Sequence, residues 1–173
     1  MQARDFDRTI IIGNSGAGKS TLAAVLAERG VYRHVALDDI YWDGPAGLKK
    51  RVEPAAKQLT AEAAAAPRWV IEGVFGWLVE VAMPRATTLI WLDLPWPECK
   101  AGLEARGPQY SPSPAEYQAL LAWAADYWQR QSSSSSAGHA KIYAAFAGHK
   151  IALRSRAEVA AFTQQCANSR ERA

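Results

Sequence analysis

The chain has 173 residues, of which 49% are hydrophobic and 21% charged, and 20 basic against 17 acidic residues leave a net charge of +3. This composition predicts one globular domain spanning residues 1–173, and so small a charge with no basic stripe argues against nucleic-acid or membrane partners.

Strands and helices are predicted to alternate along the chain. The β-branched run at 8–12 predicts a strand buried on both faces, followed by a helix at 19–29 that Gly30 ends. Later strands are expected at about 34–37, 69–71, 87–92 and 150–153, and later helices at about 54–66 and 97–105 and after the capping boxes SPAE and SRAE. Five serines at 132–136 are expected to form a solvated loop. The alternation predicts an α/β fold with a parallel sheet covered on both faces.

Neither the first residues of the chain nor its two cysteines indicate export. The first residues, MQARDFDRT, contain no apolar run of the kind that begins a signal peptide, and no later run approaches a membrane span. Cys99 and Cys166 lie far apart in no metal-ligand spacing. We therefore expect a cytoplasmic protein with two reduced thiols.

The segment between the first strand and the first helix fits G-x-x-x-x-G-K-[ST], the P-loop pattern. Its glycines let successive backbone N–H groups point at phosphate oxygens, and the helix N-terminus adds to that field. Lys19 is placed to reach the β- and γ-phosphates, the Ser20 hydroxyl suits Mg²⁺, and Thr21 is placed to support a phosphate further back. The expected ATP-binding residues are Gly13, Asn14, Ser15, Gly16, Ala17, Gly18, Lys19, Ser20 and Thr21.

The rest of the chain narrows the choice among P-loop proteins. At 173 residues there is little room for motor or transporter machinery, and the guanine-reading N-K-x-D of GTPases is absent from the sequence. A small kinase is the class that these exclusions favour.

Five segments together resemble the small P-loop kinases related to adenylate kinase, and most of all the subgroup called DNA topology modulation proteins. They are GNSGAGKSTLAAVLAERG, VALDDIYWDG, RWVIEGVFGW, TTLIWLDLPWPEC and KIALRSRAEV, in this order over nearly the whole chain. The resemblance implies a three-layer P-loop NTPase fold with a five-stranded parallel sheet in the order 2-3-1-4-5 and helices on both faces. It also implies an acceptor arm at about 41–67 and a lid at about 106–148.

Asp38 and Asp39 follow the second strand and should emerge at the carboxyl edge of the sheet, where ligands of open α/β folds bind. In similar kinases an aspartate here lies near the acceptor hydroxyl and the magnesium ion. The resemblance thus implies that Asp38 orients the hydroxyl and accepts its proton, with Asp39 as the second choice. A helix N-cap or a solvated turn is the alternative role.

Glu72 and Gly73 stand where adenylate kinases carry Asp-Gly. The resemblance implies that Glu72 supports the magnesium ion and that Gly73 lets an acceptor approach the backbone. The run LIWLD, ending at Asp93, is a competing Walker B candidate, but we interpret Asp93 as structural.

Basic and aromatic residues extend the expected acceptor site. Arg51, with the two lysines before it, faces either an anionic acceptor or solvent, and Trp42 forms either a ring-stacking wall or part of the core rim, as does Trp77. In the lid, Arg106 is the expected cation over the triphosphate, although a positive charge ending a helix is the alternative.

The remaining expectations concern the lid and the nucleotide. Arg130 and Lys141 are possible helpers of Arg106, and a lid this poor in arginine argues against fast transfer. By resemblance, the loop Arg154-Ser155-Arg156 after the last strand, with Arg154 as its nucleotide-binding residue, would contact the adenine or its ribose, more through its backbone than through its charge. His34, His139 and His149 form no motif and receive no role.

These observations predict an ATP-binding, Mg²⁺-dependent phosphotransferase whose catalytic residues are Lys19, Asp38 and Arg106. The acceptor is a small hydroxyl compound or a nucleotide, and the protein is a monomer or a small homo-oligomer. The alternative is a non-catalytic or weakly hydrolysing ATP-dependent switch that acts on a protein or DNA partner.

Overall fold

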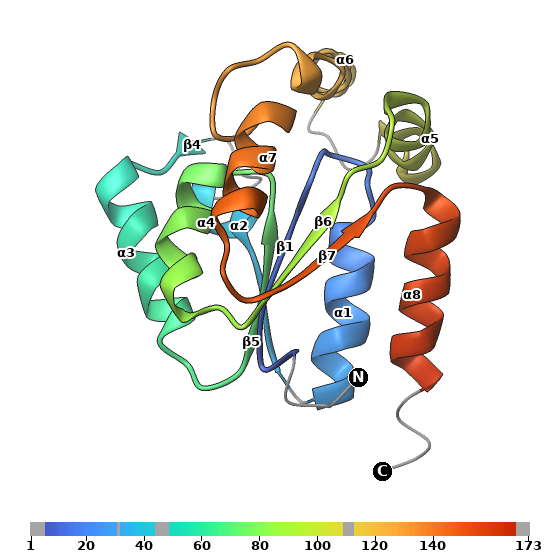
Figure 1. Cartoon of the computed structure of the whole chain (residues 1–173). Coiled ribbons are helices and arrows are strands. Elements are labelled where there is room, and N and C mark those ends of the chain that lie inside the picture. Colours follow the sequence, from blue (N-terminus) through green and yellow to red (C-terminus); the bar gives the residue numbers. More distant parts are fainter. Residues whose placement is uncertain (1–5, 31, 44–48, 109–112, 169–173) are drawn as a thin grey trace.

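The computed structural model of the chain describes residues 6–30, 32–43, 49–108 and 113–168. Its core is a parallel sheet whose strands are ordered β2-β5-β1-β6-β7 (Figure 1). Their bounds are β1 Arg8–Gly13, β2 Arg33–Ala36, β5 Trp69–Gly73, β6 Thr88–Leu92 and β7 His149–Leu153. Counted along the chain within this sheet, the order is 2-3-1-4-5, so the predicted fold class and topology are confirmed.

The strands form because their side chains are apolar on both faces of the sheet. In β1, Ile10 and Ile12 pack into one hydrophobic cluster, while Ile11 packs into a second cluster on the opposite face. This alternation follows from the two-residue period of a strand. β1 is the central strand, and β5 and β6, which both come later in the chain, pair with its two opposite edges. The carboxyl end of β1 therefore lies at the switch point where ligands of such sheets bind.

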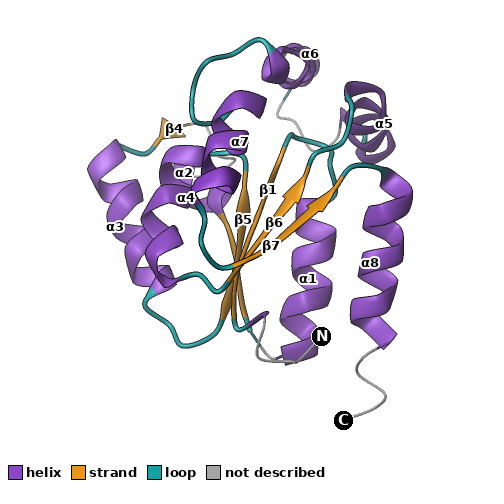
Figure 2. Cartoon of the chain, viewed as in Figure 1, coloured by secondary structure: helices purple, strands orange, loops and turns teal. Residues whose placement is uncertain are grey.

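Helices cover both faces of the sheet (Figure 2). On one face lie α1 Lys19–Gly30, α5 Trp96–Arg106 and α8 Arg156–Asn168. The other face is covered by α2 Leu37–Tyr41, α3 Glu53–Ala64, α4 Gly76–Ala82 and α7 Ser136–Ala145. The helix α6, Pro114–Ala125, lies beyond the ends of the strands, and the short 3-10 helices η3 and η5 span Met83–Arg85 and Asp126–Trp128.

Most predicted elements are present, and the capping box at Ser113 is confirmed because its hydroxyl accepts the N–H of Glu116. The helices α2, α4 and α7 were not predicted. The serine run was expected to be a solvated loop; residues 132–135 do form a loop and Ser132 is exposed, but the expectation is wrong for Ser134 and Ser135, which are buried. Ser135 is buried and caps α7 by accepting the N–H of Gly138 at 3.0 Å, and Ser134 accepts the N–H of Gly76 at 3.2 Å. Serine hydroxyls favour such positions because they replace missing helical hydrogen bonds.

The expected acceptor arm and lid are described in part. Within the arm, β3 Trp42–Asp43 and β4 Lys49–Lys50 pair antiparallel, while residues 44–48 lie outside the described residues. Within the lid, 109–112 lie outside them too, whereas α6, η5 and α7 are described. No helix in the described part is long and apolar enough to span a membrane.

Candidate functional site

The P-loop joins the end of β1 to the start of α1 and is bent around its glycines. Gly16 has a φ of +78°, a conformation that L side chains rarely adopt, and a Cβ there would lie 2.1 Å from the carbonyl oxygen of Cys99. Only glycine fits such a turn without displacing the neighbouring helix α5. The loop therefore has the curvature that a phosphate-binding nest requires.

Lys19, the first residue of α1, folds back over this loop. Its side chain is buried, and its Nζ donates to the carbonyl oxygen of Asn14 at 3.0 Å. A buried ammonium needs an anionic or polar partner, and this one lies inside the curl of the loop beside the helix N-terminus. The arrangement is suited to phosphate oxygens.

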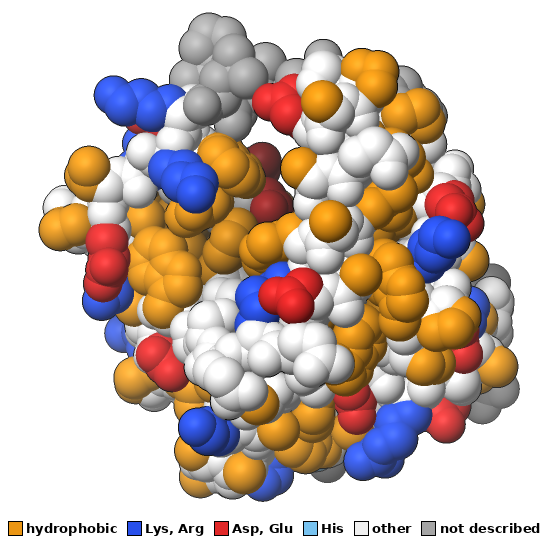
Figure 3. All heavy atoms as spheres, turned by 90° about the horizontal axis from the view of Figure 1, so that it is seen from above, with side chains coloured by type: hydrophobic (Ala, Val, Ile, Leu, Met, Phe, Trp, Pro, Cys, Tyr) orange, Lys and Arg blue, Asp and Glu red, His pale blue; other side chains and the backbone are white. Residues whose placement is uncertain are grey.

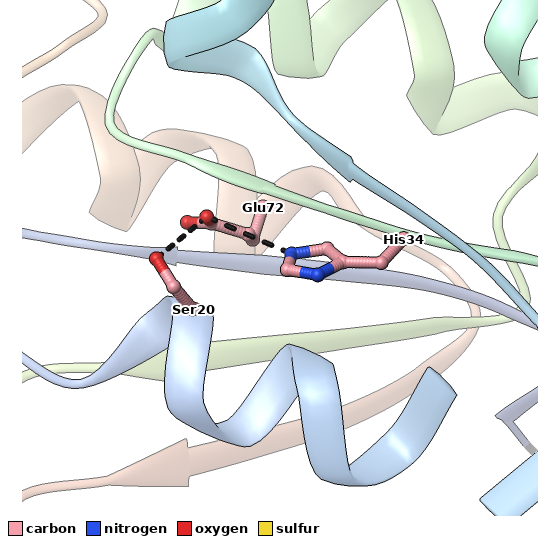
Figure 4. A network of polar contacts seen from close by, with 3 residues as sticks. All are labelled: Ser20, His34 and Glu72. Atoms are coloured by element: carbon pink, nitrogen blue, oxygen red, sulfur yellow. Dashed lines mark hydrogen bonds and ion pairs between the residues drawn. The ribbon is translucent and has the colours of Figure 1, made fainter. Parts of the chain in front are cut away.

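Ser20 and Glu72 meet at the carboxyl end of the sheet (Figure 4). The hydroxyl of Ser20 donates to Oε1 of Glu72 at 2.7 Å. Glu72 pairs with Ile11 across the sheet and points to the same face, which is the face that α1 covers. The two residues predicted to hold magnesium thus lie in direct contact.

His34 lies against the same carboxylate, with its Nε2 3.8 Å from Oε1 of Glu72. Burial acts to raise the pKa of Glu72, but His34, the charge of Lys19 and the Ser20 hydroxyl outweigh it and hold that pKa below its ordinary value. Glu72 is therefore ionised at neutral pH, as a metal-holding carboxylate must be. His34 received no role from the sequence.

Asp38 lies in the first turn of the unpredicted helix α2. Although Asp38 is exposed on α2, the protein atoms around its carboxyl partly desolvate it and raise its pKa; the negative charges of Glu72 and Asp39 also raise it, and the positive charges of Lys19 and Arg106 lower it. These couplings place Asp38 within the electrostatic reach of Lys19. A carboxylate with a raised pKa is a better proton acceptor than an ordinary aspartate.

Arg106 is exposed in the last turn of α5, and its charge acts on the pKa of Asp38. Seen along the strands from above, the molecule is hollowed, with acidic side chains at the base and apolar side chains around it (Figure 3). The predicted lid cation and the predicted proton acceptor thus belong to one electrostatic neighbourhood.

Gly73, predicted to let an acceptor approach, ends β5 and is buried. A Cβ there would lie 2.7 Å from Cβ of Leu37 in α2, so close packing of this helix explains the glycine. Gly73 is thus needed to bring α2, and Asp38 with it, against the end of β5.

Arg51 and Trp42 belong to the arm. Arg51 donates through Nε to the carbonyl oxygen of Ile40 at 2.9 Å and pairs with Asp43 at 3.1 Å, so its side chain ties the arm to α2. Trp42 remains exposed, with the ring of Tyr41 at 4.8 Å. Of this pair, Trp42 is the one available to a ligand.

The residues predicted at the nucleotide end, Thr21 and Arg154, are both exposed. Thr21 is exposed in the first turn of α1. Arg154 is exposed after β7, and its Nε lies 3.9 Å from Oδ2 of Asp93, the competing Walker B carboxylate. Asp39 is exposed on α2, where its charge acts on Asp38.

The structure gives a different role to Arg156, which the sequence analysis named only within the loop Arg154-Ser155-Arg156 expected near the nucleotide. Its guanidinium donates to the carbonyl oxygens of Gly16 at 2.8 Å and Ala17 at 2.9 Å, on the outer side of the P-loop. Its place beside Arg154, in a loop expected near the nucleotide, was the one available signal.

The donor set fits a magnesium ion that shares its ligands with phosphate. In the part of the chain that the structure describes, no three His, Cys, Asp or Glu side chains are grouped to hold a metal by themselves. Ser20 and Glu72 offer hard oxygen ligands, and Mg²⁺ usually takes one or two such protein groups together with substrate phosphates and waters. The residues present are suited to that role.

Solved structures of kinases share this fold. A gluconokinase from Sinorhizobium meliloti 1021 aligns with a TM-score of 0.59 and 14% identity over 96% of this chain and 93% of that one. A shikimate kinase from Aquifex aeolicus vf5 aligns with 0.51 and 16% over 95% and 96%. A sugar kinase from Janibacter sp. HTCC2649 aligns with 0.51 and 16% over 93% and 90%.

Sequence comparison finds less similarity than structural comparison does. The chain matches none of the protein families with which it was compared. A stretch of 68 residues is 34% identical to the uncharacterised protein YqaC of Bacillus subtilis (strain 168), which covers 39% of this chain and only 38% of that protein. The structural likeness therefore carries the conclusion, and the chain has the fold of small P-loop kinases.

Proposed function

We propose that the protein is an ATP- and Mg²⁺-dependent phosphotransferase that moves the γ-phosphoryl group of ATP to a hydroxyl of a small acceptor. The observation that carries this proposal is the contact of the Ser20 hydroxyl with the Glu72 carboxylate, 2.7 Å apart beside a P-loop lysine. We also propose that the protein belongs to the adenylate-kinase-related small P-loop kinases that its sequence resembles.

Each residue has a role in binding or orientation. Lys19 and the loop amides bind the β- and γ-phosphates, and Arg154 lies at the nucleotide end. Ser20 and Glu72 hold the magnesium ion, which supplies charge neutralisation on the phosphates. Arg106 adds a positive charge over the transferred group. Positioning and electrostatics then provide most of the catalysis.

Asp38 accepts the proton of the acceptor hydroxyl. The acceptor oxygen forms a bond to the γ-phosphorus while the bond from that phosphorus to the bridging oxygen breaks, and its electron pair stays on ADP. The hydroxyl proton passes to the Asp38 carboxylate, whose raised pKa favours this transfer. Products are ADP and a phosphate monoester of the acceptor.

The acceptor is proposed to be a small hydroxylated compound. The compared structures are described as a gluconokinase, a sugar kinase and a shikimate kinase, and the hollow seen from above is lined in part by apolar side chains (Figure 3). A hydroxylated acid, a sugar or a nucleoside bound there would bring its hydroxyl to Asp38, with the exposed Trp42 of the arm nearby.

The test is a transfer assay with γ-labelled ATP and Mg²⁺ against a panel of hydroxylated acids, sugars, nucleosides and nucleotides. Lys19→Met keeps the length of the side chain and removes its charge, so we expect loss of transfer by about a hundredfold or more. Lys150→Met is the matched control, since Lys150 is exposed at the amino end of β7.

Two outcomes would count against the enzyme. Transfer that survives unchanged in Lys19→Met would overturn the site. ATP binding without transfer to any member of the panel would overturn the phosphotransferase and leave an ATP-dependent switch as the working hypothesis.

A further inference from the structure

Arg156, the first residue of α8, donates hydrogen bonds to the P-loop from its outer side. Nη1 donates to the carbonyl oxygen of Ala17 at 2.9 Å, and Nη2 donates to those of Gly16 at 2.8 Å and Glu98 at 2.9 Å. Its backbone N–H donates to the carboxylate of Glu98. One half-buried guanidinium therefore joins the loop, α5 and α8.

The bonds to the loop decide which way its peptide groups face. In a planar trans peptide the carbonyl and the following N–H point in opposite directions. When Arg156 holds the carbonyls of Gly16 and Ala17 outward, the N–H groups of Ala17 and Gly18 must face the inside of the loop. The Ala17 N–H does so, because it donates to the carbonyl oxygen of Asn14 at 3.3 Å.

The same Asn14 oxygen accepts from Nζ of Lys19 at 3.0 Å. Lys19 thus lies on the inner side of the loop, and Arg156 lies on the outer side. The two cations have different tasks: Lys19 is placed to contact phosphate, whereas Arg156 acts on the backbone that surrounds it.

The chain leaves space for this guanidinium. A Cβ at Gly102 of α5 would lie 2.9 Å from Nη2 of Arg156 and 2.2 Å from the carbonyl oxygen of Gly16. A larger residue at position 102 would therefore push both groups apart. The planar fork of arginine, with several donors in fixed directions, suits three carbonyl acceptors, and a lysine would not replace it.

We propose that Arg156 is a positioning residue of the ATP site, which holds the P-loop amides toward the phosphates before the nucleotide binds. This inference rests on the proposed function and adds the residue that preorganises its ATP site. It requires that loss of Arg156 weakens ATP binding while the acceptor KM stays unchanged.

The experiment compares Arg156→Met and Arg156→Lys with the wild-type protein. ATP affinity is measured by calorimetry, and the acceptor KM is measured at saturating ATP. Arg85→Met is the matched control, because Arg85 also donates to a backbone carbonyl, that of Ala65 at 3.3 Å, but far from the loop. The melting temperature without nucleotide identifies the variants that fold.

We expect ATP to bind about tenfold to a hundredfold more weakly to Arg156→Met, which loses two charged hydrogen bonds to the loop. Arg156→Lys should recover only part of this loss, and Arg85→Met should bind ATP like the wild type. If Arg156→Met does not fold, Arg156→Lys alone decides, with a loss of about fivefold expected.

ATP affinity within about twofold of wild type in either folded variant would overturn the positioning role. So would a rise in acceptor KM equal to the rise in ATP Kd, since a general loss of structure would produce it. A wild-type protein that binds no ATP would overturn the proposed function, and the present inference with it.

Discussion

Ser20 donates to Glu72 across 2.7 Å although the two residues lie 52 positions apart in the chain. The contact requires the strand order, because β5 must lie next to β1 for Glu72 to reach the first turn of α1. The fold thus brings together the two residues that we propose as magnesium ligands. Such preorganisation is what a weakly chelating Mg²⁺ site needs.

Glu72→Gln keeps the size of this side chain and removes its charge. We expect the Mg²⁺ concentration that supports half-maximal transfer to rise about tenfold or more, since carboxylate ligands dominate the protein's share of magnesium binding. The measurement is the transfer rate against Mg²⁺ at fixed ATP. Glu80→Gln, on the exposed face of α4, is the control, and an unchanged Mg²⁺ dependence in Glu72→Gln would exclude the metal role.

Asp38→Asn tests the proton acceptor. We expect transfer to fall by a factor of about a hundred to ten thousand, with the affinity for ATP retained or slightly raised because one negative charge near Lys19 is removed. Rapid-quench turnover and equilibrium ATP binding separate the two effects. Asp39→Asn is the matched control one residue along α2, and an equal loss in both variants would refute the assignment to Asp38 alone.

The fold could be predicted because its signals are local. The strand β1 is a run of β-branched residues, Gly30 ends α1, and Ser113 caps α6, and each of these features follows from its own residue and the next few positions. The helices α2, α4 and α7 escaped prediction because their surroundings stabilise them. In α7, Ser135 looks like part of a polar run until its hydroxyl is seen to cap the helix.

The residues of the site likewise divide into those predicted from local sequence and those that depend on tertiary packing. The P-loop is a contiguous motif, so Lys19 and Ser20 were found from spacing alone, whereas Glu72 depended on resemblance. His34 could not be found, because its contact with Glu72 depends on the register of β2 against β5, in which Ala36 pairs with Glu72. Arg156 required the packing of α8 against the loop.

The buried His139 predicts a pH dependence of stability. Its Nε2 donates to the carbonyl oxygen of Val74 at 3.0 Å, and in the neutral ring Nδ1 accepts the hydroxyl of Tyr127 at 2.6 Å. Burial lowers the pKa of His139 from 6.5 to about 4. Since the unfolded chain takes up this proton near pH 6.5 and the folded protein does not until about pH 4, stability is lost as the pH falls through this window.

For this group alone we expect a loss of about 2 kcal/mol between pH 7 and pH 5, measured by urea unfolding. His139→Gln is expected to be less stable at pH 7 and to show a smaller difference between the two pH values. His149→Gln, which changes an exposed histidine of β7, should keep the wild-type difference. Parallel pH profiles of wild type and His139→Gln would show that the ring is not held neutral.

Asn14 predicts a link between the P-loop and α6. Its side chain is 1% exposed, its Nδ2 donates to the carbonyl oxygen of Ala124 at 2.8 Å, and its Oδ1 accepts the N–H of Ser15 at 2.8 Å. Asn14→Ala would leave both backbone groups without this partner. We therefore expect a loss of about 1–3 kcal/mol in the free energy of unfolding and weaker ATP binding, since the loop is no longer tied to the helix.

Asn14→Asp separates the two bonds. A carboxylate can still accept the Ser15 N–H, but it would repel the Ala124 carbonyl and add a negative charge to the proposed phosphate-binding loop, so ATP binding should fall further than in Asn14→Ala. The measurements are urea unfolding and ATP calorimetry, with Asn168→Ala, at the exposed end of α8, as control. If the free energy of unfolding of Asn14→Ala lies within about 0.5 kcal/mol of the wild-type value, the bond to Ala124 does not stabilise the fold. The proposed link between the loop and α6 would then be wrong.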